Sequence, residues 1–220
     1  MHEPASDRRL LRFDRIERLA HWALALLFVI LMLTAVPLYV GSVAQLVGRR
    51  ALLAEIHSWC GVALPVPLLL SLLGPWGRRM RRDVRRLNLW TPDERRWLRS
   101  LGRHPVVEPG KFNAGQKLNA AFTAGVIVAM LATGSVMHWY KPFPVDWRTG
   151  ATFVHDLIAF AVFVVVIGHT CFALTHRDAL RSMFRGWITV RWARLHAPGW
   201  AKELEVDEPE PARRVPVRGS

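Results

Sequence analysis

Cysteine is scarce in this sequence, and its scarcity excludes several kinds of redox site. Only two cysteines, Cys60 and Cys171, occur among the 220 residues. No Cys-x-x-Cys-His run is present, which excludes covalently attached c-type haem. The cysteine pattern of an iron–sulfur cluster and any molybdopterin-site pattern are also lacking. The chain alone therefore has no site for oxidising a substrate.

The sequence also lacks a cleavable leader and an internal repeat. Charges of both signs precede the first apolar run, and no small-residue cleavage site follows it, so we expect a retained membrane anchor.

Long apolar runs, by contrast, are plentiful. Each of four segments is close to the ~20 residues that a membrane-crossing helix needs. They are residues 20–40, 52–76, 118–140 and 152–175. We therefore predict an all-α membrane protein, a bundle of four transmembrane helices over residues 20–175. Pro65 and Pro67 should kink the second helix.

Basic residues are concentrated in two places. The net charge is +13. Residues 77–117, between the second and third spans, and the segment 176–220 are rich in Lys and Arg, whereas the other two loops are not. Since basic loops stay cytoplasmic, we expect segments 1–19 and 176–220 to lie in the cytoplasm and the four helices to cross the membrane. The end of the tail, from Glu203, is charged and proline-rich, so we expect it to be disordered. This placement of charge favours lipid contacts and argues against nucleic acid as a partner.

Two histidines occupy the fourth span with an informative spacing. His155 and His169 are fourteen residues apart, which is close to four helical turns, so both imidazoles project from roughly the same helix face. The rise per residue separates them by about 21 Å along the axis. A histidine inside a membrane is costly and indicates a function, and two in register indicate two stacked metal centres.

The topology gives each membrane histidine a depth. His21 starts the first helix near the inner face, and His57 lies near the outer face, where the second helix begins. The fourth helix enters from outside, which places His155 near the outer face and His169 near the inner face. Only His57 with His155 and His21 with His169 form level pairs. Two pairs of facing imidazoles in a helix bundle are typical of sites that bind haem iron.

Other interpretations of these histidines remain open. Zinc requires four ligands and each layer offers only two, a proton relay is compatible with imidazole chemistry, and four separate structural roles are conceivable. His176, just beyond the fourth span, is a candidate proton donor to a nearby site.

Five stretches resemble the cytochrome b (gamma) subunit of membrane-bound respiratory formate dehydrogenase. They are RFDRIERLAHW at 12–22, IHSWCG at 56–61, GKFNAGQK at 110–117, VHDLIAFAVFVVVIGHT at 154–170 and RDALRSMFRGWITVRWARLHAPGW at 177–200. GKFNAGQK is the most specific of them. The resemblance extends from about Arg12 to Glu205.

This resemblance implies a membrane anchor with two b-type haems. His57 and His155 would hold the outer haem, and His21 and His169 the inner one, as the depths also indicate. Electrons would come from an iron–sulfur (beta) subunit that serves a molybdenum or tungsten catalytic (alpha) subunit. The family also implies a possible higher oligomer.

The resemblance further implies a site for menaquinone or ubiquinone. In the family this site adjoins the inner-haem ligand of the fourth helix, here His169, and is lined by an Asn-Ala-Gly run, here Asn113, Ala114 and Gly115. An asparagine amide donates hydrogen bonds, and glycine lets the backbone approach a ligand closely. Asn113 is equally suited to cap the third helix.

Rival functions are a diheme subunit that serves a hydrogenase or thiosulfate reductase, a non-redox proton-conducting bundle, and an anchor that binds haem only for stability.

Arg12, Arg15 and Arg18 are candidate partners of haem propionates.

Overall fold

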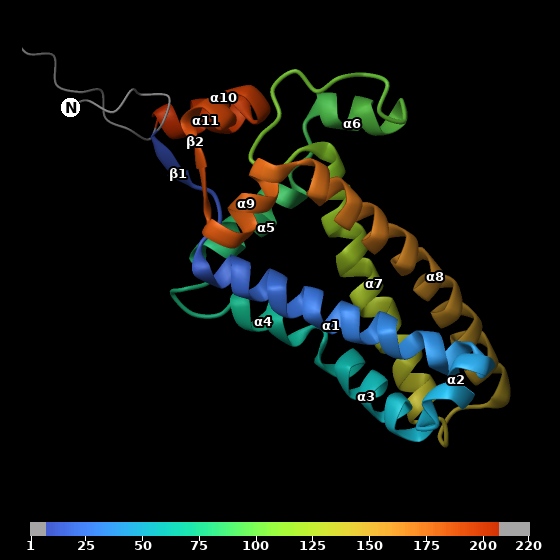
Figure 1. The fold of residues 1–220 in the computed structure, drawn as a ribbon. Coiled ribbons are helices and arrows are strands. Elements are labelled where there is room, and N and C mark those ends of the chain that lie inside the picture. The colour runs from blue at the N-terminus through green and yellow to red at the C-terminus, as the bar shows by residue number, and fades with distance from the viewer. Residues whose placement is uncertain (1–7, 207–220) are drawn as a thin grey trace, which may run out of the picture.

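Four membrane-length spans dominate the computed structural model, which describes residues 8–206 (Figure 1). The spans are helix α1 (Arg15–Tyr39), the consecutive helices α3 (Arg50–Ala63) and α4 (Val66–Ser71), helix α7 (Ala114–His138) and helix α8 (Val145–Thr175). Each is long and apolar enough to cross a membrane. The predicted fold, an all-α membrane bundle of four spans, is therefore confirmed, with α8 beginning seven residues before the expected residue 152.

Local sequence signals explain where the spans begin and break. Asp14 and Glu17 form a capping box at the start of α1, and Asn113 and Gln116 form another at the start of α7. The second span is interrupted at Pro65, between the end of α3 and the start of α4. A proline lacks the N–H that a continuous helix requires, so the predicted kink is confirmed.

The spans pack as two pairs. Helix α1 lies against α3 and α4, helix α7 lies against α8, and α3 contacts α7. Few residues of any span are buried within the protein. Most of the apolar surface is therefore left for contacts outside the chain, as expected of helices in a bilayer.

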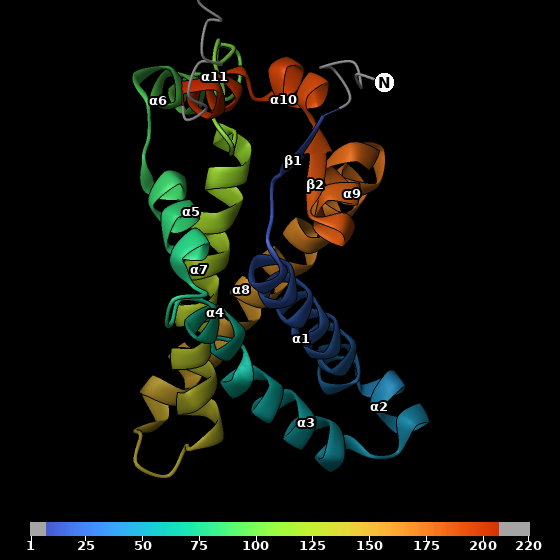
Figure 2. The ribbon, with the colours of Figure 1, turned by 90° about the vertical axis from the view of Figure 1, so that its left-hand side faces the viewer.

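The best-packed region lies at the end of the bundle where α1 begins, which we call the basic end. It contains α5 (Arg78–Asn88), α6 (Pro92–Arg99), α9 (Arg177–Arg185), α10 (Val190–His196) and α11 (Pro198–Val206). Strand β1 (Arg9–Leu11) pairs antiparallel with β2 (Trp187–Thr189), with Leu10 opposite Ile188. Figure 2 shows β1 and β2 side by side above the start of α1.

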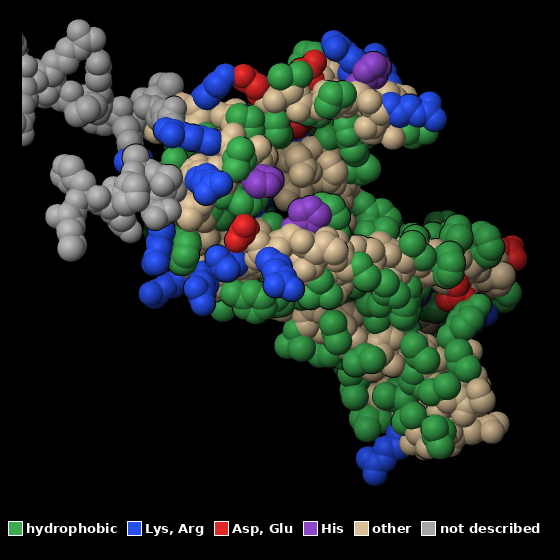
Figure 3. All heavy atoms as spheres, turned by 45° about the horizontal axis from the view of Figure 1, so that its top comes forward, with side chains coloured by type: hydrophobic (Ala, Val, Ile, Leu, Met, Phe, Trp, Pro, Cys, Tyr) green, Lys and Arg blue, Asp and Glu red, His purple; other side chains and the backbone are tan. Residues whose placement is uncertain are grey.

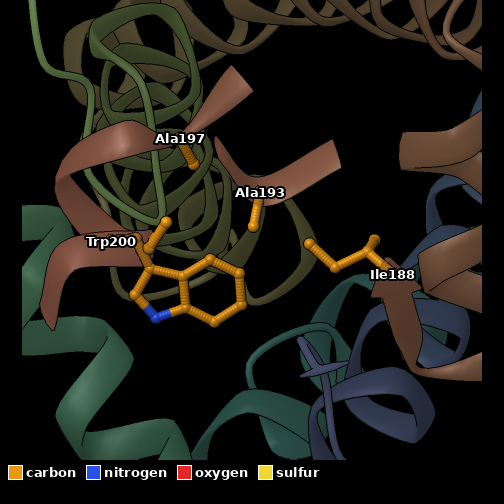
Figure 4. Close-up of a cluster of buried hydrophobic side chains, with 5 residues drawn as sticks. Ile188, Ala193, Ala197 and Trp200 are labelled. Carbon is orange, nitrogen blue, oxygen red and sulfur yellow. The ribbon is translucent and has the colours of Figure 1, made fainter. Parts of the chain in front are cut away.

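A small apolar core holds the basic end together. Ile188, Ala193, Ala197, Trp200 and Ala201 are all buried in it (Figure 4). Lys and Arg side chains gather on the outside of the same end, whereas apolar side chains cover much of the rest of the molecule (Figure 3). The described parts of the N- and C-terminal segments thus fold together.

Several elements differ from the expected loops. The basic segment 77–117 contains α5 and α6, and a short helix, α2 (Gly41–Val47), follows α1 at the opposite end of the bundle. Helix α11 continues to Val206, so the expected disorder does not begin at Glu203. The remainder of that tail, 207–220, lies outside the described residues.

Candidate functional site

Two histidine pairs bridge the helix pairs of the bundle. The ring centres of His21 on α1 and His169 on α8 are 6.4 Å apart, with the ring planes tilted by 60°. The ring centres of His57 on α3 and His155 on α8 are also 6.4 Å apart, at 62°. The structure therefore brings together the two pairs that the depths assign. Helix α8 contributes one histidine to each pair.

The spacing within each pair fits a metal held between two imidazoles. Two rings that bind one iron from opposite sides, each through a nitrogen about 2 Å from the metal, have centres roughly 6 Å apart. The apolar bundle interior around such pairs is the setting in which b-type haem is bound. By this test the four histidines fit two haems, one for each pair.

Zinc fits the arrangement less well. Among the described residues, no group of three or more His, Cys, Asp or Glu side chains is placed to hold one metal ion. Structural zinc sites use four ligands and catalytic sites three. Two-histidine layers thus favour a group that, like haem, supplies its own equatorial ligands.

Each histidine of the His57–His155 pair contacts a threonine from the neighbouring helix. Thr34 Oγ1 on α1 lies 2.8 Å from His57 Nδ1. Thr133 Oγ1 on α7 lies 3.0 Å from His155 Nδ1. Neither threonine was predicted from the sequence as part of a site, although a hydroxyl inside an apolar span is itself a signal of a polar partner.

A glycine makes room for one of the rings. A Cβ atom added to Gly134 on α7 would lie 3.4 Å from His155 Cε1. Any longer side chain at this position would enter the space that the imidazole occupies. Gly134 thereby lets α7 approach the histidine face of α8.

The Asn113 side chain caps α7. Asn113 Oδ1 accepts a hydrogen bond from the backbone N–H of Gln116 (2.9 Å), and Gln116 Oε1 accepts one from the backbone N–H of Asn113 (3.0 Å). These bonds do not use the Nδ2 amide of Asn113, which is a hydrogen-bond donor. Asn113 and Gly115 are exposed, whereas Ala114 is buried. No contact between these residues and His169 is recorded within the described part of the chain.

Two buried lysines anchor the loop around Asn113. Lys117 Nζ donates to Glu94 Oε2 (2.7 Å) and to the backbone carbonyl of Leu89 (2.6 Å). Lys111 Nζ pairs with Asp83 on α5 and lies 4.0 Å from Glu17 Oε1. Burial lowers the pKa of Lys111, and Asp83 and Glu17 partly oppose that shift. The burial of Lys117 and its pairing with Glu94 show a structural role.

Two of the arginines expected near haem propionates contact protein groups instead. Arg12 is buried at the basic end, where Nη1 donates to Ser182 Oγ (3.4 Å) and the guanidinium lies 4.7 Å from the Trp192 ring centre. Burial lowers the pKa of Arg12 to about 10. Arg18 Nε donates to the backbone carbonyl of Asp14 (3.3 Å). Arg15, by contrast, is exposed.

His176 is engaged at the end of α8. Its Nδ1 lies 2.9 Å from Thr175 Oγ1 and 2.9 Å from the backbone carbonyl of Phe172, and its ring stacks on Phe172 at 3.9 Å between centres. These contacts make it part of the helix terminus.

Comparisons with known proteins agree on one family. The sequence profile of prokaryotic cytochrome b561 matches residues 12–186. The chain is 27% identical to the formate dehydrogenase cytochrome b556 subunit of Haemophilus influenzae, over 91% of this chain and 86% of that protein. It is 25% identical to the cytochrome b556(fdo) subunit of formate dehydrogenase of Escherichia coli, over 89% and 93%. For the nitrate-inducible cytochrome b556(Fdn) subunit of the same organism the identity is 22%, over 93% and 95%.

Proposed function

Because this chain belongs to the prokaryotic cytochrome b561 family, we propose that it is the membrane anchor and electron-transfer subunit of a respiratory formate dehydrogenase, conducting electrons from an iron–sulfur subunit to membrane quinone. The observation that carries the proposal is the geometry of the histidines. Two pairs with ring centres 6.4 Å apart are stacked along α8. The names of the relatives support the link to formate dehydrogenase.

The four histidines are the proposed haem ligands. His57 and His155 would hold one haem b near one membrane face, and His21 and His169 would hold a second near the other. The two haems, when bound, supply a relay for single electrons across the membrane. The four histidines lie on helices of apolar composition, which would limit access of water to both groups.

Quinone reduction is proposed near His169. Asn113 would donate its Nδ2 amide to a quinone carbonyl, and Gly115 would allow the ring to approach the backbone. The capping box holds Asn113 in one conformation, which reduces the entropy lost when a ligand binds. Menaquinone and ubiquinone both present carbonyls to such a donor.

The charge distribution supports one orientation in the bacterial inner membrane. The basic end carries α5 and the described parts of both terminal segments, and basic segments remain in the cytoplasm. Quinone would then take up protons from the cytoplasm. The iron–sulfur (beta) and molybdenum or tungsten (alpha) subunits would dock at the opposite end, where Leu46 on α2 and Trp147 on α8 are exposed. A higher oligomer of such complexes is compatible with the exposed apolar surface.

A reduced-minus-oxidised spectrum with a haem-to-protein ratio tests the ligand pairs. We expect two haems for each wild-type chain and one in each of the variants His57→Ala and His169→Ala. His138→Ala is the matched control, because His138 ends α7 outside both pairs. Absence of haem from the wild-type chain would overturn the cytochrome assignment and favour a non-redox bundle.

The partner is tested separately. We expect a formate-oxidising enzyme to co-purify with the chain and formate to reduce its haems. Reduction of the haems by hydrogen, or co-purification of a thiosulfate reductase, would instead indicate that this chain is the diheme subunit of that other enzyme. Intact haem spectra without quinone-dependent reoxidation would indicate that the haem serves stability only.

A further inference from the structure

The threonines beside the His57–His155 pair occupy equivalent positions. Thr34 comes from α1, which packs against the helix of His57, and Thr133 comes from α7, which packs against the helix of His155. Each hydroxyl lies within 3.0 Å of an Nδ1 atom. Two independent helix interfaces thus present the same group to the same ring nitrogen.

The single proton of each hydroxyl determines the direction of these bonds. Thr34 Oγ1 lies 2.8 Å from the backbone carbonyl of Ile30, and Thr133 Oγ1 lies 2.8 Å from that of Ala129. A carbonyl can only accept, so each hydroxyl donates its proton to the preceding turn. The hydroxyl oxygen is then left to accept from the imidazole. This arrangement assigns the proton of His57 and of His155 to Nδ1, the nitrogen that keeps its proton when Nε2 binds a metal.

This protonation leaves Nε2 of both rings as the free lone pair for a metal. A hydrogen bond donated by Nδ1–H also makes the imidazole a stronger electron donor to a metal on Nε2, which stabilises oxidised iron and lowers its reduction potential. We infer that Thr34 and Thr133 are positioning residues that present Nε2 of His57 and His155 to iron and lower the potential of that site. The inference rests on the proposed role of these histidines as haem ligands.

The other pair lacks this support. Within residues 8–206, no threonine or serine hydroxyl is hydrogen-bonded to the ring of His21 or His169. The threonines thus act on one site only. A lower potential at the site near the electron donor and a higher one near quinone makes transfer between them more favourable.

Redox titration of a chain with one remaining site gives a direct test. His169→Ala should retain only the site of His57 and His155. In that background we expect Thr34→Val and Thr133→Val each to raise the midpoint potential of the remaining haem, and the double variant to raise it further. Thr34→Ser and Thr133→Ser keep the hydroxyl and should stay close to the parent.

Thr123→Val is the matched control. Thr123 is also on α7 and its hydroxyl donates to the carbonyl four residues before it (2.9 Å), but it has no histidine partner. We expect no shift from this variant. An equal shift from Thr123→Val, or unchanged potentials in the variants of Thr34 and Thr133, would overturn the inference.

Two outcomes concern haem content. Loss of haem from a valine variant but not from the matching serine variant would support the positioning role, because valine has the shape of threonine without its hydroxyl. A His169→Ala parent without haem would overturn the ligand pairs and this inference together. If the His169→Ala parent keeps its one haem and the threonine variants leave its midpoint potential unchanged, this inference fails while the ligand pairs stand.

Discussion

Lys111 and Asp83 form a buried ion pair that joins the loop before α7 to helix α5. The pair lies at the basic end, and Lys111 is two residues before Asn113 in the chain. Arg86 Nη1 also lies 3.2 Å from Asp83 Oδ1, so the Asp83 carboxylate forms ion pairs with two cations. The conformation of the proposed quinone loop therefore depends on a carboxylate of another helix.

Asp83→Asn should destabilise the protein. The substitution leaves the Lys111 ammonium buried without its nearest counter-charge, and breaking such a pair typically costs about 3 kcal/mol. We expect a clear fall in the thermal unfolding midpoint of the chain in detergent. Asp93→Asn is the control, because Asp93 and Arg96 form an exposed pair at 3.7 Å, and exposed pairs contribute little. Equal midpoints for the two variants would contradict the role given to Asp83.

The lowered pKa of Lys111 predicts a dependence of stability on pH. Because burial lowers this pKa from its ordinary value of 10.5, the unfolded chain holds more protons than the folded chain in the alkaline range below that value. Stability from this group therefore rises with pH across that range. The unfolding free energy of wild type should increase relative to that of Lys111→Met as pH is raised towards 10.5. A constant difference between the two proteins would show that Lys111 does not titrate differently on folding.

The close approach of Gly134 to His155 predicts that a large side chain at position 134 displaces the imidazole. Gly134→Leu would place a branched side chain where the imidazole lies, so we expect loss of one haem of two, measured as the haem-to-protein ratio. Gly134→Ala adds only a Cβ at 3.4 Å and should retain both.

Gly125→Leu is the control for that experiment. Gly125 lies on the same helix with no atom within 4 Å of an added Cβ, and leucine is a better helix former than glycine. Both haems should be retained. Two haems in Gly134→Leu would show that the ring of His155 needs no close approach of α7.

Periodic and local features of this fold could be predicted from the sequence. Span lengths follow from apolar runs, the break at Pro65 follows from the missing N–H, and the levels of His155 and His169 follow from helical rise. Each of these depends on residues close together in the chain. The pairing of His57 with His155 followed from the order and direction of the spans.

Contacts between distant segments could not be predicted in the same way. Arg9 pairs with Thr189, and Lys111 with Asp83, because tertiary packing brings these segments together. The contact of Thr34 with His57 depends on the rotation of α1 about its axis, which a span with apolar residues on every face leaves undetermined. The threonines therefore emerged only with the structure.

The two roles of Asn113 can be separated by substitution. Asn113→Asp and Asn113→Ser both keep a side-chain oxygen that caps α7, but both lose the Nδ2 amide. If this amide donates to a quinone carbonyl, loss of one hydrogen bond worth roughly 1.4 kcal/mol should lower the rate of quinone-dependent haem reoxidation about tenfold. Unfolding midpoints should remain close to wild type.

Asn113→Ala completes the series, because it removes both the cap and the amide. We expect the same loss of quinone reactivity together with a stability loss of about 1 kcal/mol. The aspartate variant adds a negative charge near the ligand, whereas the serine variant does not, so agreement between them would assign the effect to the missing donor. Wild-type reoxidation in the serine variant, with a defect only in Asn113→Ala, would show that Asn113 acts solely as the cap of α7 and that quinone finds its donor elsewhere.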